Sequence, residues 1–439
     1  MNERDSEALA CMLRERGWTQ VGDEEAADIL LFNTCSVRDQ AERKAIGKVG
    51  LMKRLKRRRP DVVIGVLGCM AQNYGEELLA TVPHIDLVVG TDNLHRLPEM
   101  LDAVLQGDRP QVNVETGTDL LGQLRGHPNT SVSAYVSVMR GCDQFCSYCI
   151  VPYVRGREKS RAIEDIVAEA TDLAHRGTRE IFLLGQNVTA YGLAEARREG
   201  TFSPEMSPFA DLLRAVNGID GVERIRFTSP HPTFMNDAFM DAVCSLPAVC
   251  EGLHIPLQSG SNRMLKAMNR GYTADEYAEK VRTIQSRMPG VVLSTDVIVG
   301  YPGETEADFE STREMMNDIG FEMAYIFKYS PRAGTRAARL ADDVPTEVKE
   351  ARNQVLLQDL AARSEGANRA CRGTDVEVLV EGESKRNTAR WTGRTRTGKV
   401  CIFEPRPGVA VGDLVTVRVT GTTAYSLYGS VSGTGNDEC

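Results

Sequence analysis

Apolar runs alternate with amphipathic segments along most of the chain, which is the pattern of an α/β protein. Over residues 1–106, this pattern predicts a helix at residues 6–16 and buried strands at residues 27–35, 62–69 and 86–90. Such an alternation implies a doubly wound parallel sheet. Cys35 and Cys69 each end a predicted strand, so we expect both at the sheet's carboxyl edge, where ligands bind. Their matched placement favours metal ligands over two ordinary buried cysteines.

A second domain is expected over residues 128–365, after a connector at residues 107–133 in which Gly and Pro interrupt every period. Strand and helix alternate there through six rounds, which predicts a partial (βα)6 barrel. The expected strands cover residues 134–139, 180–184, 224–229, 253–257, 291–299 and 323–329. Short polar motifs follow these strands, at the edge that carries active sites in such folds. Each motif alone is more often a turn than a ligand contact.

Residues 366–433 change character, because short alternating strands separated by glycines replace the strand–helix pattern. Residues 375–381, 400–403 and 414–419 predict a small antiparallel barrel of the OB type. Trp391 sits among basic residues, which suits phosphate contact and base stacking on a single-stranded RNA loop. A solvated basic face is the alternative. The basic residues are Arg369, Arg372, Lys385, Arg386, Arg390, Arg394, Arg396 and Lys399.

The composition of the chain limits which partners and which cellular compartment are expected. The chain has 439 residues and a formal net charge of −9, so any nucleic acid must bind local basic patches. Eleven cysteines is an odd number in a long chain, which argues for a reducing compartment rather than a disulfide scaffold. The N-terminus shows no signal-peptide pattern, and no apolar run is long enough for a membrane span. We therefore expect a cytoplasmic protein.

The strongest chemical signal is a C-x3-C-x2-C loop formed by Cys142, Cys146 and Cys149, directly after the expected strand at residues 134–139. Three thiolates can hold three irons of a 4Fe–4S cube and leave the fourth iron open, whereas four cysteines are the usual complement. A structural zinc site normally needs four ligands, and no partner pair follows nearby. A disulfide framework suits short secreted chains. The spacing therefore favours an iron–sulfur loop.

The cysteine motif, with Tyr148 before its last cysteine, resembles the radical S-adenosylmethionine (SAM) superfamily. Residues 150–161 read IVPYVRGREKSR and narrow the resemblance to the methylthiotransferases, most closely the MiaB-type tRNA enzymes. Residues 183–188 (LLGQNV), 257–261 (LQSGS) and 299–305 (VGYPGET) match the same pattern, and residues 366–433 resemble the TRAM RNA-binding domain. The resemblance covers essentially the whole chain.

The resemblance implies cofactors and contacts. Cys142, Cys146 and Cys149 are expected to hold a 4Fe–4S cluster whose open iron chelates SAM, so that electron transfer yields a 5′-deoxyadenosyl radical. Contacts to SAM or to the substrate are implied for four residues at strand ends: Gln186, Asn187, Gln258 and Ser259.

The resemblance also implies an auxiliary 4Fe–4S cluster bound by Cys35 and Cys69. In the family, a third cysteine lies near the N-terminus in a Cys-Gln-Met-Asn segment, followed shortly by Asp-Ser-Glu. This chain begins Met1-Asn2 and has the Asp-Ser-Glu triplet at residues 5–7, so the third ligand and a first strand are expected to be missing. Neighbouring sheet edges should then be unpaired. Cys11 falls inside the helical pattern and is read as a packed helix cysteine.

The resemblance implies methylthiolation of C2 of N6-isopentenyladenosine beside the tRNA anticodon, with two SAM molecules and the auxiliary cluster as the sulfur source. The basic helix at residues 53–59 and the C-terminal barrel would hold the anticodon arm. An electron donor such as flavodoxin or ferredoxin is implied, and we expect a monomer. The alternatives are a ribosomal-protein aspartate methylthiotransferase, a threonylcarbamoyl-adenosine methylthiotransferase and, outside the class, an RNA-binding module with structural zinc.

Overall fold

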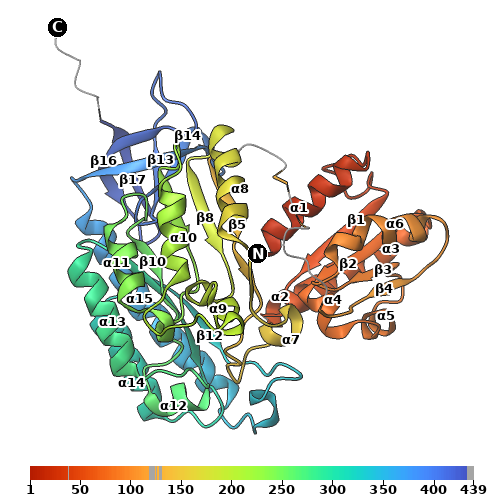
Figure 1. Cartoon of the computed structure of the whole chain (residues 1–439), viewed down its shortest axis with the longest axis horizontal. Coiled ribbons are helices and arrows are strands. Elements are labelled where there is room, and N and C mark those ends of the chain that lie inside the picture. Colours follow the sequence, from red (N-terminus) through yellow and green to blue (C-terminus); the bar gives the residue numbers. More distant parts are fainter. Residues whose placement is uncertain (38, 118–123, 125, 128–130, 433–439) are drawn as a thin grey trace. The chain divides into compact units, whose positions relative to one another are not determined.

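The computed structural model describes residues 1–37, 39–117, 124, 126, 127 and 131–432 (Figure 1). These residues fall into two compact units. The first draws on residues 1–129, 137–161 and 332–338, and the second on residues 130–136, 162–331 and 339–439. The cysteine loop, which we expected in the second domain, thus packs with the N-terminal sheet. No helix in the described part of the chain is long and apolar enough to cross a membrane.

The first unit is built on a four-stranded parallel sheet in the order β1-β2-β3-β4. Its strands are β1 (Ile29–Thr34), β2 (Val63–Gly68), β3 (Leu87–Val89) and β4 (Gln111–Asn113). Ile64 and Val66 of β2 pack against α2 (Asp39–Leu51) and α3 (Lys53–Arg58), whereas Val63 and Leu67 pack against α1 (Asn2–Glu15) and α6 (Leu97–Leu105). Helices therefore cover both faces, which confirms the predicted parallel α/β domain.

The edges of this sheet differ from its centre. Every residue of β2 is buried, whereas β1 lies at an edge and only its last residue is buried. The short strand β4 lies within the residues that we expected to be a connector. The remaining helices of this sheet region are α4 (Cys69–Tyr74) and α5 (Glu77–Thr81).

The cysteine loop lies in the same unit, between two short antiparallel strands. The strands β6 (Met139–Arg140) and β7 (Lys159–Ser160) pair antiparallel, and the loop with helix α7 (Val151–Arg155) lies between them along the chain. The strand expected at residues 134–139 is therefore divided into β5 (Ser133–Ser137) and β6.

The second unit contains parallel strands in chain order, as predicted for a partial barrel. One sheet has the order β5-β8-β9 and the next β10-β11-β12, and a parallel bridge between Ile225 and Val249 extends from β9 toward β10. These strands are β8 (Glu180–Leu184), β9 (Arg224–Phe227), β10 (Gly252–His254), β11 (Val292–Val299) and β12 (Met323–Lys328). The helices between and after them are α8 (Ile163–His175), α9 (Leu193–Glu199), α10 (Pro208–Asn217), α11 (Asp237–Ser245), α12 (Asn262–Ala267), α13 (Ala274–Arg287), α14 (Glu306–Ile319) and α15 (Thr346–Ala370).

A closed five-stranded barrel in the order β13-β14-β15-β17-β16 completes the second unit. Its strands are β13 (Asp375–Ser384), β14 (Asn387–Thr395), β15 (Val400–Phe403), β16 (Leu414–Thr422) and β17 (Ser426–Val431). Val378, Cys401, Phe403, Val417 and Leu427 fill its interior. The small predicted barrel is confirmed, although β14 and β17 were not predicted. Figure 1 shows it in blue, beyond α15 in the chain.

Candidate active site

The C-x3-C-x2-C loop is held in a defined shape by its neighbours in the first unit. Gly141 has φ 77°, and a Cβ there would lie 2.1 Å from the carbonyl oxygen of Arg157, so only glycine fits. The amide of Asp143 donates to the Glu158 carboxylate and the amide of Glu158 donates to the Asp143 carboxylate, both at 3.1 Å. Phe145 has φ 46°, an uncommon value for a non-glycine residue that tends to persist at functional sites.

The three thiols of this loop lie close enough to influence one another. Cys146 is buried, and Cys142 and Cys149 are half-buried. Burial raises the pKa of the Cys142 thiol far above its usual value, the Gln144 amide lowers it, and Cys149, Glu158 and Cys146 raise it further. Neighbouring thiolates of this kind need a cationic partner. The donor set therefore fits an iron–sulfur cluster.

The described residues contain no group of three His, Cys, Asp or Glu side chains that could hold one metal ion. A structural zinc site needs convergence on one ion, whereas a 4Fe–4S cube places each thiolate on a separate iron. All the described cysteines are free thiols.

Cys35 and Cys69 follow neighbouring strands, as the sequence predicted. Thr34 of β1 is in register with Gly68 of β2, so the two cysteines leave the same edge of the sheet. A Cβ on Gly68 would lie 2.7 Å from the Thr34 carbonyl oxygen, and this close approach requires glycine. Cys69 is buried and Cys35 is half-buried. Cys11 instead lies in α1, where its Sγ would be 3.1 Å from a Cβ on Gly126.

The structure also brings Cys69 to the C-x3-C-x2-C loop. Cys69 shares an apolar cluster with Ile150 and Val154, and Ile150 directly follows Cys149. The Thr91 hydroxyl donates to the Val154 carbonyl and anchors α7 there. The two expected sets of cluster ligands therefore lie on adjoining elements of one unit.

Polar residues at the carboxyl ends of β8 and β9 form a partly unsatisfied network in the second unit. The Thr189 hydroxyl donates to Asn187 Oδ1 at 2.9 Å and accepts from the His231 amide at 2.8 Å. Among the described residues, three buried atoms here have no hydrogen-bond partner: Gln186 Oε1, Asn187 Nδ2 and His231 Nε2. Buried polar atoms are normally paired, so these atoms fit a polar ligand. Burial lowers the pKa of His231 well below its usual value, which keeps the imidazole neutral.

The segment after β10 contributes the other two residues expected from the sequence. Gln258 has φ 71°, its amide donates to the Asp296 carbonyl at 2.8 Å, and its carbonyl accepts from the Ile298 amide at 3.0 Å. The Ser259 hydroxyl is buried and lies 3.1 Å from the Thr312 hydroxyl. Ser259 is therefore already engaged by a neighbouring side chain, whereas Gln258 sits at a strained strand end.

The sequence did not show the burial of three residues that the structure places at these sites. His231 lies in one of the short polar motifs expected at the carboxyl ends of the strands, and Arg155 was expected to form a local ion pair or to meet phosphate. Arg140 and Arg155 are buried in the first unit, at 7% and 5% exposure. Only the fold shows this, because their burial depends on residues far away in the chain.

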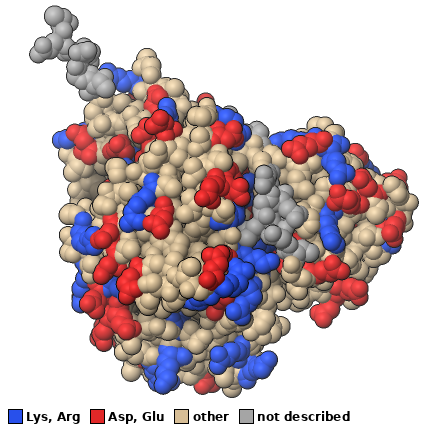
Figure 2. Space-filling model, in the orientation of Figure 1, with Lys and Arg blue, Asp and Glu red and all other residues tan. Residues whose placement is uncertain are grey.

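The basic residues of the C-terminal barrel divide into two groups. Some bind the amino ends of the parallel strands: Arg396 pairs with Glu251 at 2.8 Å, and Lys399 pairs with Glu322 at 2.5 Å. Lys385 and Arg386 at the β13–β14 turn are exposed. The predicted basic RNA-binding cluster is thus smaller than its sequence suggests. Figure 2 shows acidic and basic side chains interspersed over the visible face.

The basic helix of the first unit is also partly neutralised. Lys56 pairs with the buried Asp86 at 2.7 Å, and Arg58 pairs with Glu25 at 2.7 Å. Lys53, Arg54 and Arg57 of α3 remain exposed. These three residues are the part of the helix that can meet phosphate.

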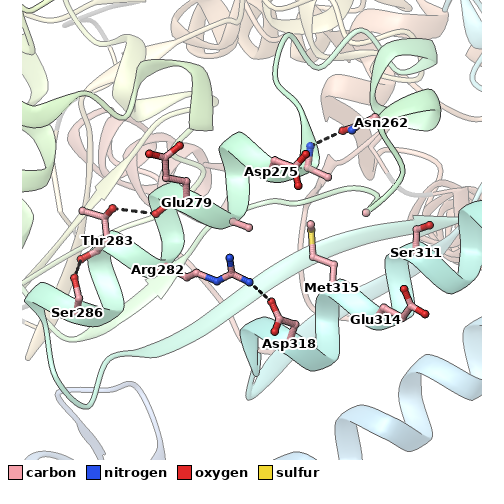
Figure 3. A pocket seen from close by; sticks show the side chains of 13 residues that line it. Asn262, Asp275, Glu279, Arg282, Thr283, Ser286, Ser311, Glu314, Met315 and Asp318 are labelled. Carbon is pink, nitrogen blue, oxygen red and sulfur yellow. Dashed lines mark hydrogen bonds and ion pairs between the residues drawn. The ribbon is translucent and has the colours of Figure 1, made fainter.

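A groove of ≈ 770 Å³ lies between α13 and α14. Figure 3 shows Arg282 on α13 reaching toward Asp318 on α14, and the two side chains are bound at 2.5 Å. Four carboxylates line the groove: Asp275, Glu279, Glu314 and Asp318. This acidic lining does not suit RNA, and none of the expected site residues lines it.

Three family models match the chain. The radical SAM superfamily matches residues 136–316, an uncharacterized protein family (UPF0004) matches residues 1–90, and the TRAM domain matches residues 369–432. A tRNA-2-methylthio-N6-dimethylallyladenosine synthase from Opitutus terrae is 48% identical over 98% of this chain and 95% of that protein. The corresponding synthase from Akkermansia muciniphila is 43% identical over 98% of this chain and 96% of that protein.

Among solved structures, the chain resembles the radical SAM methyltransferase TsrM from Kitasatospora setae, solved with tryptophan and a SAM analogue. The TM-score is 0.56 at 15% identity, over 83% of this chain and 87% of that chain. This likeness supports the fold.

Proposed function

This chain belongs to the tRNA-2-methylthio-N6-dimethylallyladenosine synthase family, and from that membership we propose that it methylthiolates C2 of N6-dimethylallyladenosine beside the tRNA anticodon. The observation that carries the proposal is the 48% identity along 98% of the chain, which spans the cysteine loop, the parallel barrel and the small C-terminal barrel. The ribosomal-protein and threonylcarbamoyl-adenosine enzymes remain the alternatives that an assay must separate.

Cys142, Cys146 and Cys149 would hold the SAM-binding 4Fe–4S cluster through three thiolates. When bound, this cluster with SAM supplies the hydrogen-atom abstraction that an aromatic C–H bond requires. Gln186, Asn187 and His231 would orient SAM, because each has a buried polar atom that no described residue satisfies. The neutral imidazole of His231 presents a hydrogen-bonding nitrogen without adding a charge beside the sulfonium.

Cys35 and Cys69 would supply two thiolates to the auxiliary cluster that serves as the sulfur source, and a third ligand would have to come from elsewhere. Cys69 lies against Ile150 and Val154, beside the SAM-cluster loop, so the two clusters would share one wall of apolar side chains. Apolar surroundings exclude water and limit side reactions of a radical.

The substrate arm would be held by phosphate contacts from both units. Exposed basic residues suited to this role include Lys385 and Arg386 on the C-terminal barrel and Lys53, Arg54 and Arg57 on α3. An electron donor such as flavodoxin or ferredoxin would reduce the SAM cluster. A tRNA substrate and reduced thiolates suit the cytoplasm, and one chain supplies all the residues named, which suits a monomer.

The test is an anaerobic assay of the reconstituted full chain with SAM and a reductant. Three substrates are offered: tRNA with N6-dimethylallyladenosine, tRNA with threonylcarbamoyl-adenosine, and the ribosomal protein. We expect a methylthio group on the first alone, detected by mass spectrometry of digested nucleosides. The variant Cys146→Ala is the control and should give no product. Product on either other substrate instead would overturn the proposal.

A further inference from the structure

One face of the strand β12 exposes large apolar side chains. Lys328 of β12 pairs with Glu350 of α15 at 2.8 Å, so every second residue of the strand faces this helix and the residues between them face away from it. Met323 and Tyr325 face away from α15 and are 50% and 45% exposed. Phe327 continues this face and stacks with Tyr325, with ring centroids 6.4 Å apart. These three residues, here called the β12 face, form an apolar surface of the kind that binds ligands or partners.

A polar pair lies beside the β12 face, on the other two strands of the same sheet. Nε2 of His254 on β10 lies 3.3 Å from Oδ2 of Asp296 on β11, and Nδ1 of the same ring lies 3.0 Å from the Ser294 hydroxyl. Both ring nitrogens are therefore engaged, which fixes the orientation of the imidazole. Tyr325 is in register with Asp296, and its ring packs edge-on against His254 with centroids 5.9 Å apart. The pair and the β12 face thus form one continuous surface.

This surface adjoins a strand end at which a contact to SAM or to the substrate is expected. The amide of Gln258 donates to the carbonyl of Asp296 at 2.8 Å, and the amide of Ile298 donates to the carbonyl of Gln258 at 3.0 Å. Gln258 is therefore a direct neighbour of Asp296. The Asp296 side chain is 28% exposed, and His254 holds its Oδ2. The carboxylate thus keeps the capacity to accept from a further donor.

The chemistry of this surface complements one of the candidate bases. A base that leaves the RNA stack is recognised by aromatic stacking and by hydrogen bonds to its polar edge. N6-dimethylallyladenine offers a flat ring, an N6–H donor and a branched apolar substituent. An aromatic ring such as Tyr325 suits the flat ring, and the flexible Met323 suits the substituent. A threonylcarbamoyl group carries its own carboxylate, which the Asp296 charge repels.

We propose that this surface binds the modified adenine and selects its N6 substituent. Tyr325 stacks on the ring, Asp296 accepts from N6–H, and Met323 contacts the dimethylallyl group. This role rests on the proposed function, which it extends by naming the residues that separate dimethylallyl from threonylcarbamoyl substrates. The hydrogen bond from His254 keeps the Asp296 carboxylate in place beside Tyr325.

The experiment measures tRNA binding to the anaerobically reconstituted full chain with SAM and without reductant, so that no turnover occurs. Filter binding at one salt concentration compares three forms of one tRNA: unmodified, with N6-dimethylallyladenosine and with threonylcarbamoyl-adenosine. We expect the unaltered chain to prefer the dimethylallyl form about tenfold over the unmodified form and about a hundredfold over the threonylcarbamoyl form. Each ratio compares two RNAs on one preparation, so a fraction of misfolded protein does not alter it.

Two substitutions separate stacking from charge. Tyr325→Ala removes the ring, so the preference for the dimethylallyl form over the unmodified form should disappear, whereas Tyr325→Phe should keep it. Asp296→Asn keeps the size and an acceptor oxygen but removes the charge, so the preference over the threonylcarbamoyl form should fall to about tenfold. Tyr425→Ala is the matched control, because Tyr425 is 82% exposed on the small barrel. It should leave both ratios unchanged.

The binding ratios and the activity assay fail in different ways. Unchanged ratios in Tyr325→Ala and Asp296→Asn would overturn the role of this surface, and so would an equal loss of preference in Tyr425→Ala. An unaltered chain that binds the three forms equally would overturn it as well. Failure of the proposed function appears in a separate measurement, as the absence of product from the unaltered chain on dimethylallyl tRNA.

Discussion

The two ends of the parallel strands in the second unit differ in what their buried polar side chains bind. At the amino ends, Arg224 donates to the Arg394 carbonyl at 2.7 Å and to Glu377 at 2.8 Å, and Arg226 donates to Glu180 at 2.6 Å. At the carboxyl ends, Gln186, Asn187 and His231 each keep a buried atom that no described residue pairs, and at the amino ends Arg224 keeps its Nε in the same state although both of its Nη atoms are bound. The amino ends hold the C-terminal barrel in place, whereas the carboxyl ends leave polar groups for a ligand.

This difference indicates that a ligand could gain hydrogen bonds at the carboxyl ends. A buried polar atom without a partner destabilises a protein by about 1–3 kcal/mol, so its retention needs a reason. The left-handed backbones of Ser229 (φ 61°) and Gln258 (φ 71°) also lie at the carboxyl ends of β9 and β10. The left-handed backbones and three of the unpaired buried atoms thus lie at the carboxyl ends, which is the edge that carries chemistry in parallel barrels.

Removing one thiol of the cysteine loop should abolish iron binding and activity, whereas removing a buried cysteine elsewhere should affect stability alone. Cys146→Ala takes away one of three thiolates, so we expect loss of the SAM-binding iron and of all product. Cys250→Ala is the matched control, because Cys250 is a buried cysteine at the amino ends of the strands. It should keep its iron and lose about 1 kcal/mol of stability. Iron content that stays normal in Cys146→Ala would contradict the assignment of the loop.

Removing a buried ion pair at the amino ends of the strands should lower the stability of the protein and leave its affinity for SAM unchanged. Arg226→Gln leaves Glu180 as a buried carboxylate without its ion pair, since both side chains are under 10% exposed. Losing one partner of a buried pair costs about 3–5 kcal/mol. We expect a clear fall in the urea midpoint and an unchanged SAM dissociation constant in the protein that remains folded. A weaker SAM affinity at full stability would place a binding role at the amino ends.

Removing an unpaired atom at the carboxyl ends should have the converse effect. Gln186→Leu keeps a side chain of similar size and deletes the buried Oε1. We expect SAM to bind about tenfold more weakly, equivalent to about 1.4 kcal/mol, while the ligand-free protein is no less stable. Isothermal titration and urea unfolding measure the two quantities. Unchanged SAM binding with reduced stability would show that Gln186 serves packing alone.

The buried imidazole of His231 makes the carboxyl ends sensitive to acid. Its folded pKa lies well below the value of 6.5 that applies in the unfolded chain. Below about pH 6.5 the unfolded state therefore binds a proton that the folded state does not. The free energy of unfolding consequently decreases as the pH is lowered. From this group we expect a loss of up to about 1.4 kcal/mol per pH unit. Unfolding measured from pH 7 to 5 should show a shallower slope in His231→Phe, and equal slopes would refute this origin.

Reversing the charge of an exposed basic residue should have the smallest effect of these variants, a modest loss of tRNA affinity. Lys385→Glu reverses one charge at the β13–β14 turn, so tRNA affinity should fall a few-fold and the salt dependence of binding should weaken. Arg418→Glu provides the same change of charge elsewhere on the barrel, where Arg418 already pairs with Asp375. Filter binding at several salt concentrations compares the two. Equal losses in both variants would mean that net charge, and not this turn, governs binding.

Sequence patterns predicted the elements whose own residues carry the signal. Residues 180–184 and 400–403 were expected as strands and are observed as β8 and β15 with the same bounds. β14 was missed because its sequence, NTARWTGRT, is mostly polar, and its strand conformation comes from pairing with β13 and β15. The strand β4 is only three residues long and has no period of its own.

The site was predicted less completely than the fold. The cysteine spacing is local and could be read directly, and the sheet register explains why Cys35 and Cys69 share an edge. The burial of Arg140, Arg155 and His231 could not be read, because a charged or polar residue reads as exposed until distant elements cover it. The same reason explains Arg396, whose partner Glu251 lies 145 residues away.

The most direct measurement is the iron and acid-labile sulfide content of the anaerobically reconstituted chain, beside the triple variant with Cys142, Cys146 and Cys149 changed to Ala. The SAM-binding cluster alone predicts about four of each per chain and both clusters together about eight, with about four lost in the triple variant in either case. Zinc without acid-labile sulfide, or iron that the triple variant retains in full, would contradict a radical SAM site on this loop.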